Sequence, residues 1–133
     1  MDEFIIKPNI TEKTILVVDD SNITRKLIEK VYKGQYKVLM ASNGREAIDI
    51  VDTMPDNVII AILLDLNMPN LDGFAVLDYF KSKGLFEKIP VSIITGDSSK
   101  ETITRVFTYN IVDVLIKPFS AFDIEKIVSK MIK

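Results

Sequence analysis

The sequence predicts an α/β fold, a doubly wound parallel sheet in which five strands alternate with five helices. Short apolar runs rich in Val, Ile and Leu alternate with segments whose apolar residues recur at helical spacing. The longest run, Val58 to Leu64, is uninterrupted and stops abruptly at Asp65. Such a run is typical of a strand buried on both faces, as in a parallel sheet that helices cover on both sides.

The five strands are expected at residues 14–18, 36–41, 58–65, 90–95 and 112–116. The second and fifth contain a charge, at Lys37 and Asp113, and charge within a strand is characteristic of sheet edges. The other three are almost wholly apolar in the middle, so we expect them in the centre. The strand order 2-1-3-4-5 satisfies both conditions and is one of the two common doubly wound orders.

Helix signals follow each expected strand. Capping or turn residues open the five helices, at Ser21-Asn22, Ser42-Asn43-Gly44, Asp72, Gly96-Asp97-Ser98-Ser99 and Ser120. We expect Ile23 and Ile28 to face inward from the first helix and Phe107 from the fourth. Asn110 is expected to end the fourth helix in the left-handed conformation, which asparagine tolerates better than most residues.

Length and composition indicate one domain, at residues 14–133, after a short amino-terminal extension at 1–13. The net charge of −2, without a basic stripe, gives no reason to expect nucleic-acid binding. The apolar runs are too short to span a bilayer and no signal peptide is visible, so we expect a cytoplasmic domain without membrane contact. The chain contains no cysteine and no histidine, which excludes thiol chemistry, histidine catalysis and histidine metal ligands.

Polar side chains stand at the carboxyl ends of four expected strands. Asp19-Asp20 ends the first, Asp65 the third, Thr95 the fourth and Lys117 the fifth. These ends lie along one edge of a parallel sheet, where ligands bind in open α/β folds. Because the first and third strands are expected to be neighbours, three carboxylates converge there.

This set of side chains fits phosphoryl transfer to a carboxylate. Three like charges need a counter-charge, which Mg²⁺, or Mn²⁺ in its place, supplies when carboxylates, waters and a phosphate bind it. The backbone carbonyl of Asn67 adds a candidate ligand. Lys117 would neutralise the phosphoryl oxygens, Thr95 would donate a hydrogen bond, and Asp65 would attack. Each residue alone also fits a turn, a cap or a solvated lysine, and only their joint placement favours the phosphoryl site.

With these residues, the sequence resembles the receiver domain of two-component response regulators, from about Thr14 to Lys133. The resemblance rests on four segments, Asp19-Asp20, Leu64-Asp65-Leu66-Asn67-Met68-Pro69 with Asp72-Gly73, Thr95, and Lys117-Pro118-Phe119. It implies a flavodoxin-like fold in which Asp65 accepts a phosphoryl group. It also implies that Asp20 binds Mg²⁺ directly with Asp19 nearby, that Asn67 gives its carbonyl, and that the Lys117–Pro118 peptide is cis.

The resemblance also implies partners. The phosphoryl donor would be a histidine kinase or phosphotransfer protein, or a small phosphodonor, because the chain has no histidine of its own. The kinase is expected to dock on the first helix, near Asn22, Ile23 and Lys26. The fourth helix, fifth strand and fifth helix would form the surface that an output domain or partner protein reads, and a homodimer is left open. Beyond its own phosphorylation and dephosphorylation the domain is not expected to be an enzyme.

One position departs from the family pattern. Receiver domains usually have Tyr or Phe three residues before the lysine, and its ring turns inward when the threonine moves. Val114 stands there, so we expect coupling through the fourth helix and its preceding loop, and Tyr109 is interpreted as an exposed residue at a helix end. The resemblance also implies that Asn67 and Asp97, two residues after Asp65 and Thr95, influence how fast the phosphoryl group hydrolyses. Both are polar, so we expect a phosphorylated state that turns over rather than persists.

Two other classes of function remain open. Aspartyl-phosphate phosphohydrolases use similar residues, but they usually place the nucleophile in an Asp-x-Asp motif on the first strand and have a substrate-selecting cap. A receiver-like scaffold that binds partners without phosphorylation is the other alternative. The complete acidic set argues against the scaffold, and Val114 keeps it open.

Overall fold

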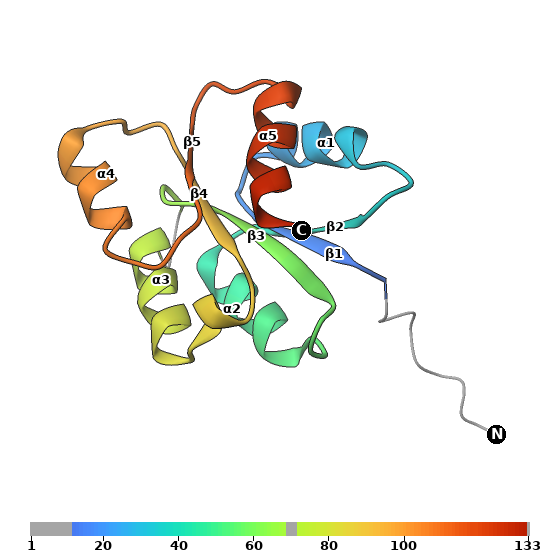
Figure 1. Ribbon diagram of the computed structural model, residues 1–133, viewed down its shortest axis with the longest axis horizontal. Coiled ribbons are helices and arrows are strands. Elements are labelled where there is room, and N and C mark those ends of the chain that lie inside the picture. Colours follow the sequence, from blue (N-terminus) through green and yellow to red (C-terminus); the bar gives the residue numbers. More distant parts are fainter. Residues whose placement is uncertain (1–11, 69–71, 133) are drawn as a thin grey trace.

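A computed structural model describes residues 12–68 and 72–132, and in it five parallel strands form one sheet in the order β2-β1-β3-β4-β5 (Figure 1). The strands are β1 Thr14–Val18, β2 Lys37–Ala41, β3 Ile59–Asp65, β4 Val91–Thr95 and β5 Val114–Ile116. The predicted fold class and strand order are confirmed. Residues 1–11 of the expected extension, and Pro69 of the family motif, lie outside the described residues.

The helices alternate with these strands as predicted. They are α1 Asn22–Val31, α2 Gly44–Thr53, α3 Gly73–Ser82, α4 Lys100–Val106 and α5 Ala121–Met131, with a short 3-10 helix, η1 Leu85–Glu87, before β4. Each α-helix begins after a residue whose side chain accepts a backbone N–H of the first turn, at Ser21, Asn43, Asp72, Ser99 and Ser120. These caps satisfy donors that no helical carbonyl reaches, and they are the capping residues that the sequence predicts.

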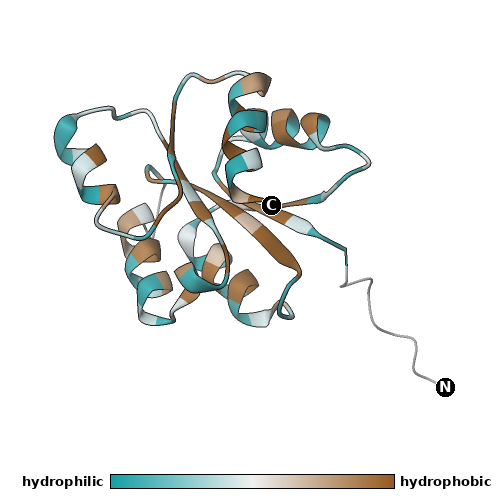
Figure 2. Cartoon of the chain, in the orientation of Figure 1, coloured by the Kyte–Doolittle hydropathy of each residue, from teal (hydrophilic) through white to brown (hydrophobic). Residues whose placement is uncertain are grey.

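The sheet separates two apolar layers (Figures 1 and 2). On one side, α2, α3 and the end of α4 pack on the strands through buried residues such as Leu64, Phe80 and Val106. On the other side, α1 and α5 pack through residues such as Ile28 and Ile124. Strands β1 and β4 are buried along their whole length, because helices cover both faces of the central strands.

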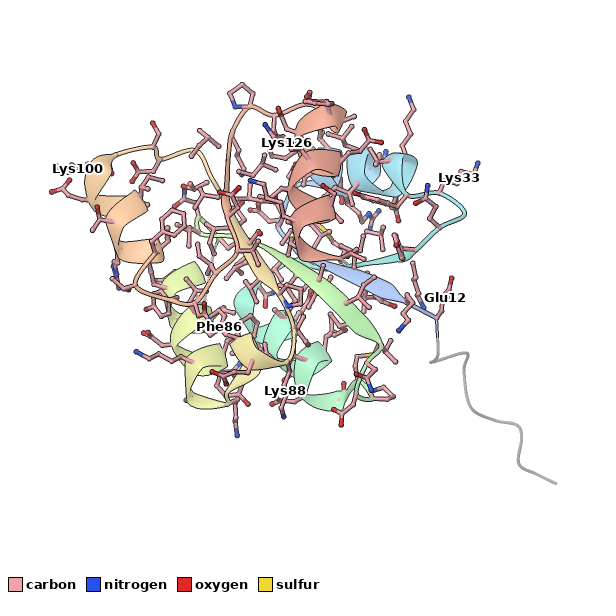
Figure 3. All side chains as sticks on the ribbon, viewed as in Figure 1. Glu12, Lys33, Phe86, Lys88, Lys100 and Lys126 are labelled. Carbon is pink, nitrogen blue, oxygen red and sulfur yellow. The ribbon has the colours of Figure 1, made fainter. Side chains whose placement is uncertain are left out.

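Charged side chains cover the outside of these layers. Figure 3 shows Lys33, Lys88 and Lys100 pointing away from the body of the domain. Among the described residues, no helix combines the length and apolar character that crossing a bilayer requires.

Three local predictions are wrong. Ile23 is 81% exposed, because α1 turns Thr24 and Ile28 toward the core instead. Phe107 is 51% exposed, since it is the residue at which the chain leaves α4. Asn110 is not left-handed: the Ile111 N–H donates to the Tyr109 carbonyl and closes a tight turn over it. Asn57, with a φ of 70°, is the non-glycine residue that adopts a positive φ in the described part of the chain.

Gly73 permits a close approach that positions the end of β3. It is the first residue of α3, and its N–H donates to the Leu66 carbonyl at 3.2 Å. A Cβ atom here would lie 2.6 Å from the Cα of Leu66 and 3.0 Å from the carbonyl oxygen of Asp65. Because backbone atoms cannot move aside as a flexible side chain does, α3 begins this close to Asp65 only with glycine.

We predict that Gly73→Ala destabilises the fold by about 1 to 3 kcal/mol, the usual range for overpacking a tight site. Urea denaturation measures this change. Gly96→Ala is the matched control, because Gly96 has no positive φ and a Cβ there meets nothing within 4 Å. Equal free energies of unfolding for the two variants would show that Leu66 leaves room for a Cβ atom at position 73.

Candidate functional site

Asp65 lies at the carboxyl end of the central strand β3 and is fully buried. Its Oδ2 accepts a hydrogen bond from Lys117 Nζ at 2.9 Å, and its Oδ1 accepts one from the backbone N–H of Asn67, also at 2.9 Å. A carboxylate at 0% exposure needs such donors, since water cannot solvate it. The strand therefore ends in one fixed carboxylate, at the edge that the carboxyl ends of the parallel strands form.

Asp19 and Asp20 follow β1, the neighbour of β3. Carboxylate oxygens of Asp19, Asp20 and Asp65 lie within 4.8 Å of one another. Asp19 is fully buried and its Oδ1 accepts the Ser21 N–H at 2.9 Å, but its Oδ2 is buried without a hydrogen-bond partner among the described residues. Burial raises the pKa of Asp19 and the charge of Asp65 adds to this rise.

These oxygens fit a hard divalent cation. Mg²⁺ prefers a small number of carboxylate oxygens and completes its shell with water or phosphate. The buried, unpartnered oxygen of Asp19 is the direct indication, because a buried acceptor without a donor is costly. Asp20 is exposed, so the cluster is open on one side.

Lys117 brings positive charge to the cluster from β5. Its side chain is 35% exposed, whereas that of Asp65 is 1% exposed. Burial alone would lower the pKa of Lys117, but the hydrogen bond and attraction of Asp65 outweigh it, so the pKa is raised. The backbone N–H of Lys117 donates to the Thr95 carbonyl at 2.9 Å, and the Lys117–Pro118 peptide is cis, as the family resemblance implies.

Thr95 ends β4, which lies between β3, whose last residue is Asp65, and β5, which Lys117 follows. It is fully buried, and its Oγ1 accepts the Asp97 N–H at 2.9 Å. The Asp97 carboxylate accepts the Ser99 N–H at 2.9 Å and the Thr102 hydroxyl at 2.7 Å. These bonds from Thr102 and Ser99 lower the pKa of Asp97. Both oxygens of Asp97 are thus occupied by α4 and the turn before it.

The structure gathers the predicted residues as the strand order requires. Asp19, Asp20, Asp65 and Lys117 lie in direct proximity, and Thr95 occupies the next strand end without a hydrogen bond to Asp65. Asn67 is exposed and bonds to Asp65 through its backbone. The individual roles of these residues in metal and phosphoryl binding stay predictions.

The environment predicted for Tyr109 is wrong, and the hydrogen bonds of Asp97 were not foreseen from the sequence. Tyr109 is half-buried rather than exposed, because its ring packs 6.4 Å from that of Phe74 and 6.3 Å from that of Phe86, between centroids. Its hydroxyl donates to Asp78 of α3. The bonds of Asp97 to α4 were not predicted, although the spacing Asp97-x-Ser99-x-x-Thr102 before a helix is a detectable signal for side-chain capping.

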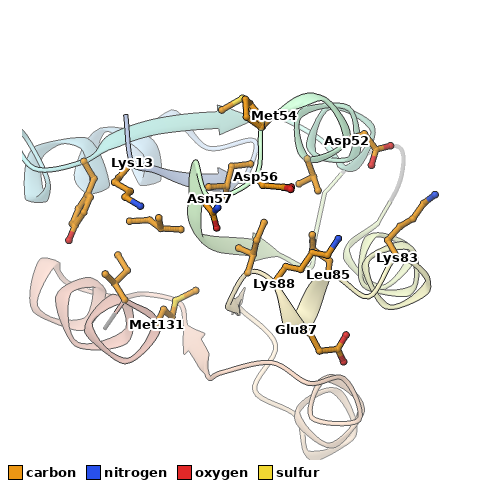
Figure 4. Close-up of a pocket in the computed structure, with 17 residues that line it drawn as sticks. Lys13, Asp52, Met54, Asp56, Asn57, Lys83, Leu85, Glu87, Lys88 and Met131 are labelled. Atoms are coloured by element: carbon orange, nitrogen blue, oxygen red, sulfur yellow. The ribbon is translucent and has the colours of Figure 1, made fainter. Parts of the chain in front are cut away.

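A cavity of about 1120 Å³ opens at the opposite edge of the sheet (Figure 4). Its lining includes Lys13, Asn57 and Ile89, which precede strands, and Met131 at the end of α5. No residue of the carboxylate cluster lines it. Acidic and basic side chains alternate around it, as Asp52, Lys83, Glu87 and Lys88 show, and they give it no clear ligand preference.

Relatives and solved structures agree with this fold. The two-component response regulator ORR7 of Oryza sativa subsp. japonica is 28% identical over 120 residues, covering 90% of this chain and 56% of its own length. A probable cyclic di-GMP phosphodiesterase of Vibrio cholerae is 32% identical over 112 residues, covering 84% of this chain and 25% of its own. The chain thus spans about half of the first relative and a quarter of the second.

The chemotaxis response regulator CheY4 of Vibrio cholerae superposes with a TM-score of 0.79 at 24% identity, covering 92% of this chain and all of that one, which shows a shared fold. The family model described as the response regulator receiver domain matches residues 15–129. That match includes Asp19, Asp20, Asp65 and Lys117. The chain belongs to the receiver domain family of two-component response regulators.

Proposed function

We propose that Asp65 accepts a phosphoryl group from a phosphohistidine on a partner kinase or phosphotransfer protein, or from a small phosphodonor. The observation that supports it most is the buried Asp65 carboxylate, bonded at 2.9 Å to Lys117 and within 4.8 Å of oxygens from Asp19 and Asp20. Membership of the receiver family favours this acceptor role over the phosphohydrolase and scaffold alternatives.

In the proposed reaction, a carboxylate oxygen of Asp65 attacks the phosphorus atom. The new P–O bond forms as the P–N bond to the donor imidazole breaks, and the imidazole leaves with the electron pair. Lys117 neutralises charge on the phosphoryl oxygens, and the Thr95 hydroxyl donates a hydrogen bond to one of them. Lys117 already lies beside the proposed acceptor, with its Nζ 2.9 Å from Asp65 Oδ2.

Asp19, Asp20, Asp65 and the Asn67 carbonyl would hold Mg²⁺, or Mn²⁺ in its place. When bound, the cation would offset the carboxylate repulsion and the charge on the transferring group. Asp19, which is fully buried, would direct its unpartnered oxygen to this cation, and Asp20, which is exposed, would admit it from solvent.

The donor is proposed to dock at the amino-terminal ends of α1 and α5. Ile23 is 81% exposed on α1 and Phe122 is 69% exposed on α5. The two helices pack on the same face of the sheet (Figure 1). Exposed large apolar side chains next to a reactive carboxylate suit a transient protein contact. The surface of α4, β5 and α5 is proposed to contact an output domain or a partner protein.

The first test is intact-mass measurement after incubation with Mg²⁺ and acetyl phosphate, a small phosphodonor. We predict one phosphoryl adduct on the parent chain. Asp65→Asn, which keeps the side-chain shape, should show none, and EDTA added before the acetyl phosphate should prevent the adduct from forming on the parent. An equal adduct on Asp65→Asn, or none on the parent, would overturn the proposed function.

The second test concerns the cation alone. We predict that Mg²⁺ raises the melting temperature of the parent, because a ligand at 100 times its Kd stabilises by about 2.7 kcal/mol. Asp20→Asn should raise the melting temperature without Mg²⁺, since it removes one of three repelling charges, and should lose most of the Mg²⁺-dependent rise. Asp56→Asn is the control, since exposed Asp56 lines the cavity at the other edge. The same Mg²⁺-dependent rise in both variants would place the cation elsewhere.

A further inference from the structure

Helix α4 is held by little apolar packing. Val106 is the only residue of α4 that is buried, whereas α5 buries four of its residues and α3 buries Gly73, Val76, Leu77 and Phe80. A short helix with so small a buried face has low local stability. Its position therefore depends strongly on the contacts at its two ends.

The amino-terminal end of α4 is connected to Thr95 through Asp97. The Asp97 N–H donates to Thr95 Oγ1 at 2.9 Å, and the Asp97 carboxylate accepts the Thr102 hydroxyl at 2.7 Å. Hydrogen bonds to a charged carboxylate are about twice as strong as neutral ones. Two consecutive hydrogen bonds thus connect Thr95 with α4.

The hydroxyl proton of Thr95 is available for a new acceptor. Its present acceptor is the Asp97 carbonyl at 3.5 Å, which is the outer limit for a hydrogen bond. Thr95 is fully buried at the strand end beside that of Asp65, since Asp65 pairs with Ile94. A phosphoryl oxygen on Asp65 would be a far stronger acceptor than this carbonyl.

The other end of α4 is anchored on α3. Tyr109 donates its hydroxyl to Asp78, and its ring packs against that of Phe74. The Arg105 guanidinium lies 3.6 Å from the centroid of the Phe74 ring, a cation–π contact. Aromatic and charged contacts thus fix this end, while the Asp97 contacts hold the end nearer the site.

We propose that Asp97 and Thr102 relay the phosphorylation of Asp65 from Thr95 to the amino-terminal end of α4, which moves relative to its Tyr109 anchor. The proposal rests on the proposed function, because it requires a phosphoryl group on Asp65. Thr95 turns toward the phosphoryl oxygen, the Asp97 N–H follows it, and the Asp97 carboxylate carries Thr102 with it. Asp97 and Thr102 are positioning residues, and they provide the coupling that Val114, which has no ring, cannot provide.

The test compares ¹H–¹⁵N NMR spectra with and without Mg²⁺ and acetyl phosphate, with the phosphorylated fraction of each sample measured by intact mass. In the parent, the amide signals of residues 100–106 should shift on phosphorylation. Thr102→Val is nearly isosteric and removes the hydroxyl, so it should be phosphorylated to the same extent but lose these shifts. Thr102→Ser keeps the hydroxyl and should restore them.

Thr104→Val is the matched control, because Thr104 is exposed on the same helix and forms no side-chain hydrogen bond within residues 12–68 and 72–132. It should retain the full shifts. Full shifts in phosphorylated Thr102→Val, or failure of Thr102→Ser to restore them, would overturn the relay alone. Absence of an adduct on the parent would overturn the proposed function and the relay with it.

Discussion

The ion pair between Lys117 and Asp65 is the interaction on which the rest of the site depends. It places an ammonium group 2.9 Å from a fully buried carboxylate. Lys117 directly follows β5, Asp65 ends β3, and β4 lies between these two strands. Without it, Asp65 would keep one backbone donor and the repulsion of two neighbouring aspartates. A buried charge that loses its partner is strongly destabilising. Lys117 therefore helps to keep the Asp65 carboxylate buried at the carboxyl-terminal edge of the sheet.

The fold supplies the geometry that this arrangement needs. Because β1 and β3 are parallel neighbours, their carboxyl ends bring Asp19, Asp20 and Asp65 together without any long-range loop. Gly73 lets α3 begin against Leu66, which limits movement at the end of β3. Three neighbouring carboxylates repel one another, so we expect the cluster to disfavour the metal-free fold, a common compromise between stability and function at a site proposed to react.

The strand order and the cluster were predictable from the sequence, since Lys37 and Asp113 mark the edge strands and four of the five strands end at, or directly before, a site residue. Periodicity was less reliable for Ile23, because it does not determine how far a helix rotates about its axis. The environment of Tyr109 was not predictable, since it depends on Asp78 and Phe74 of α3, far away in sequence. Local sequence patterns thus predict which residues end the strands, but they predict contacts between helices less well.

Chemical mapping of the phosphorylated residue tests the central claim most directly. Sodium borohydride reduces an acyl phosphate to an alcohol, so a phosphorylated aspartate becomes homoserine, which peptide sequencing by mass spectrometry locates. The protein would be incubated with Mg²⁺ and acetyl phosphate, reduced and digested. If Asp65 is the acceptor, homoserine appears at position 65 and at no other aspartate. Homoserine at position 19 or 20, or at none, would contradict the assignment of Asp65.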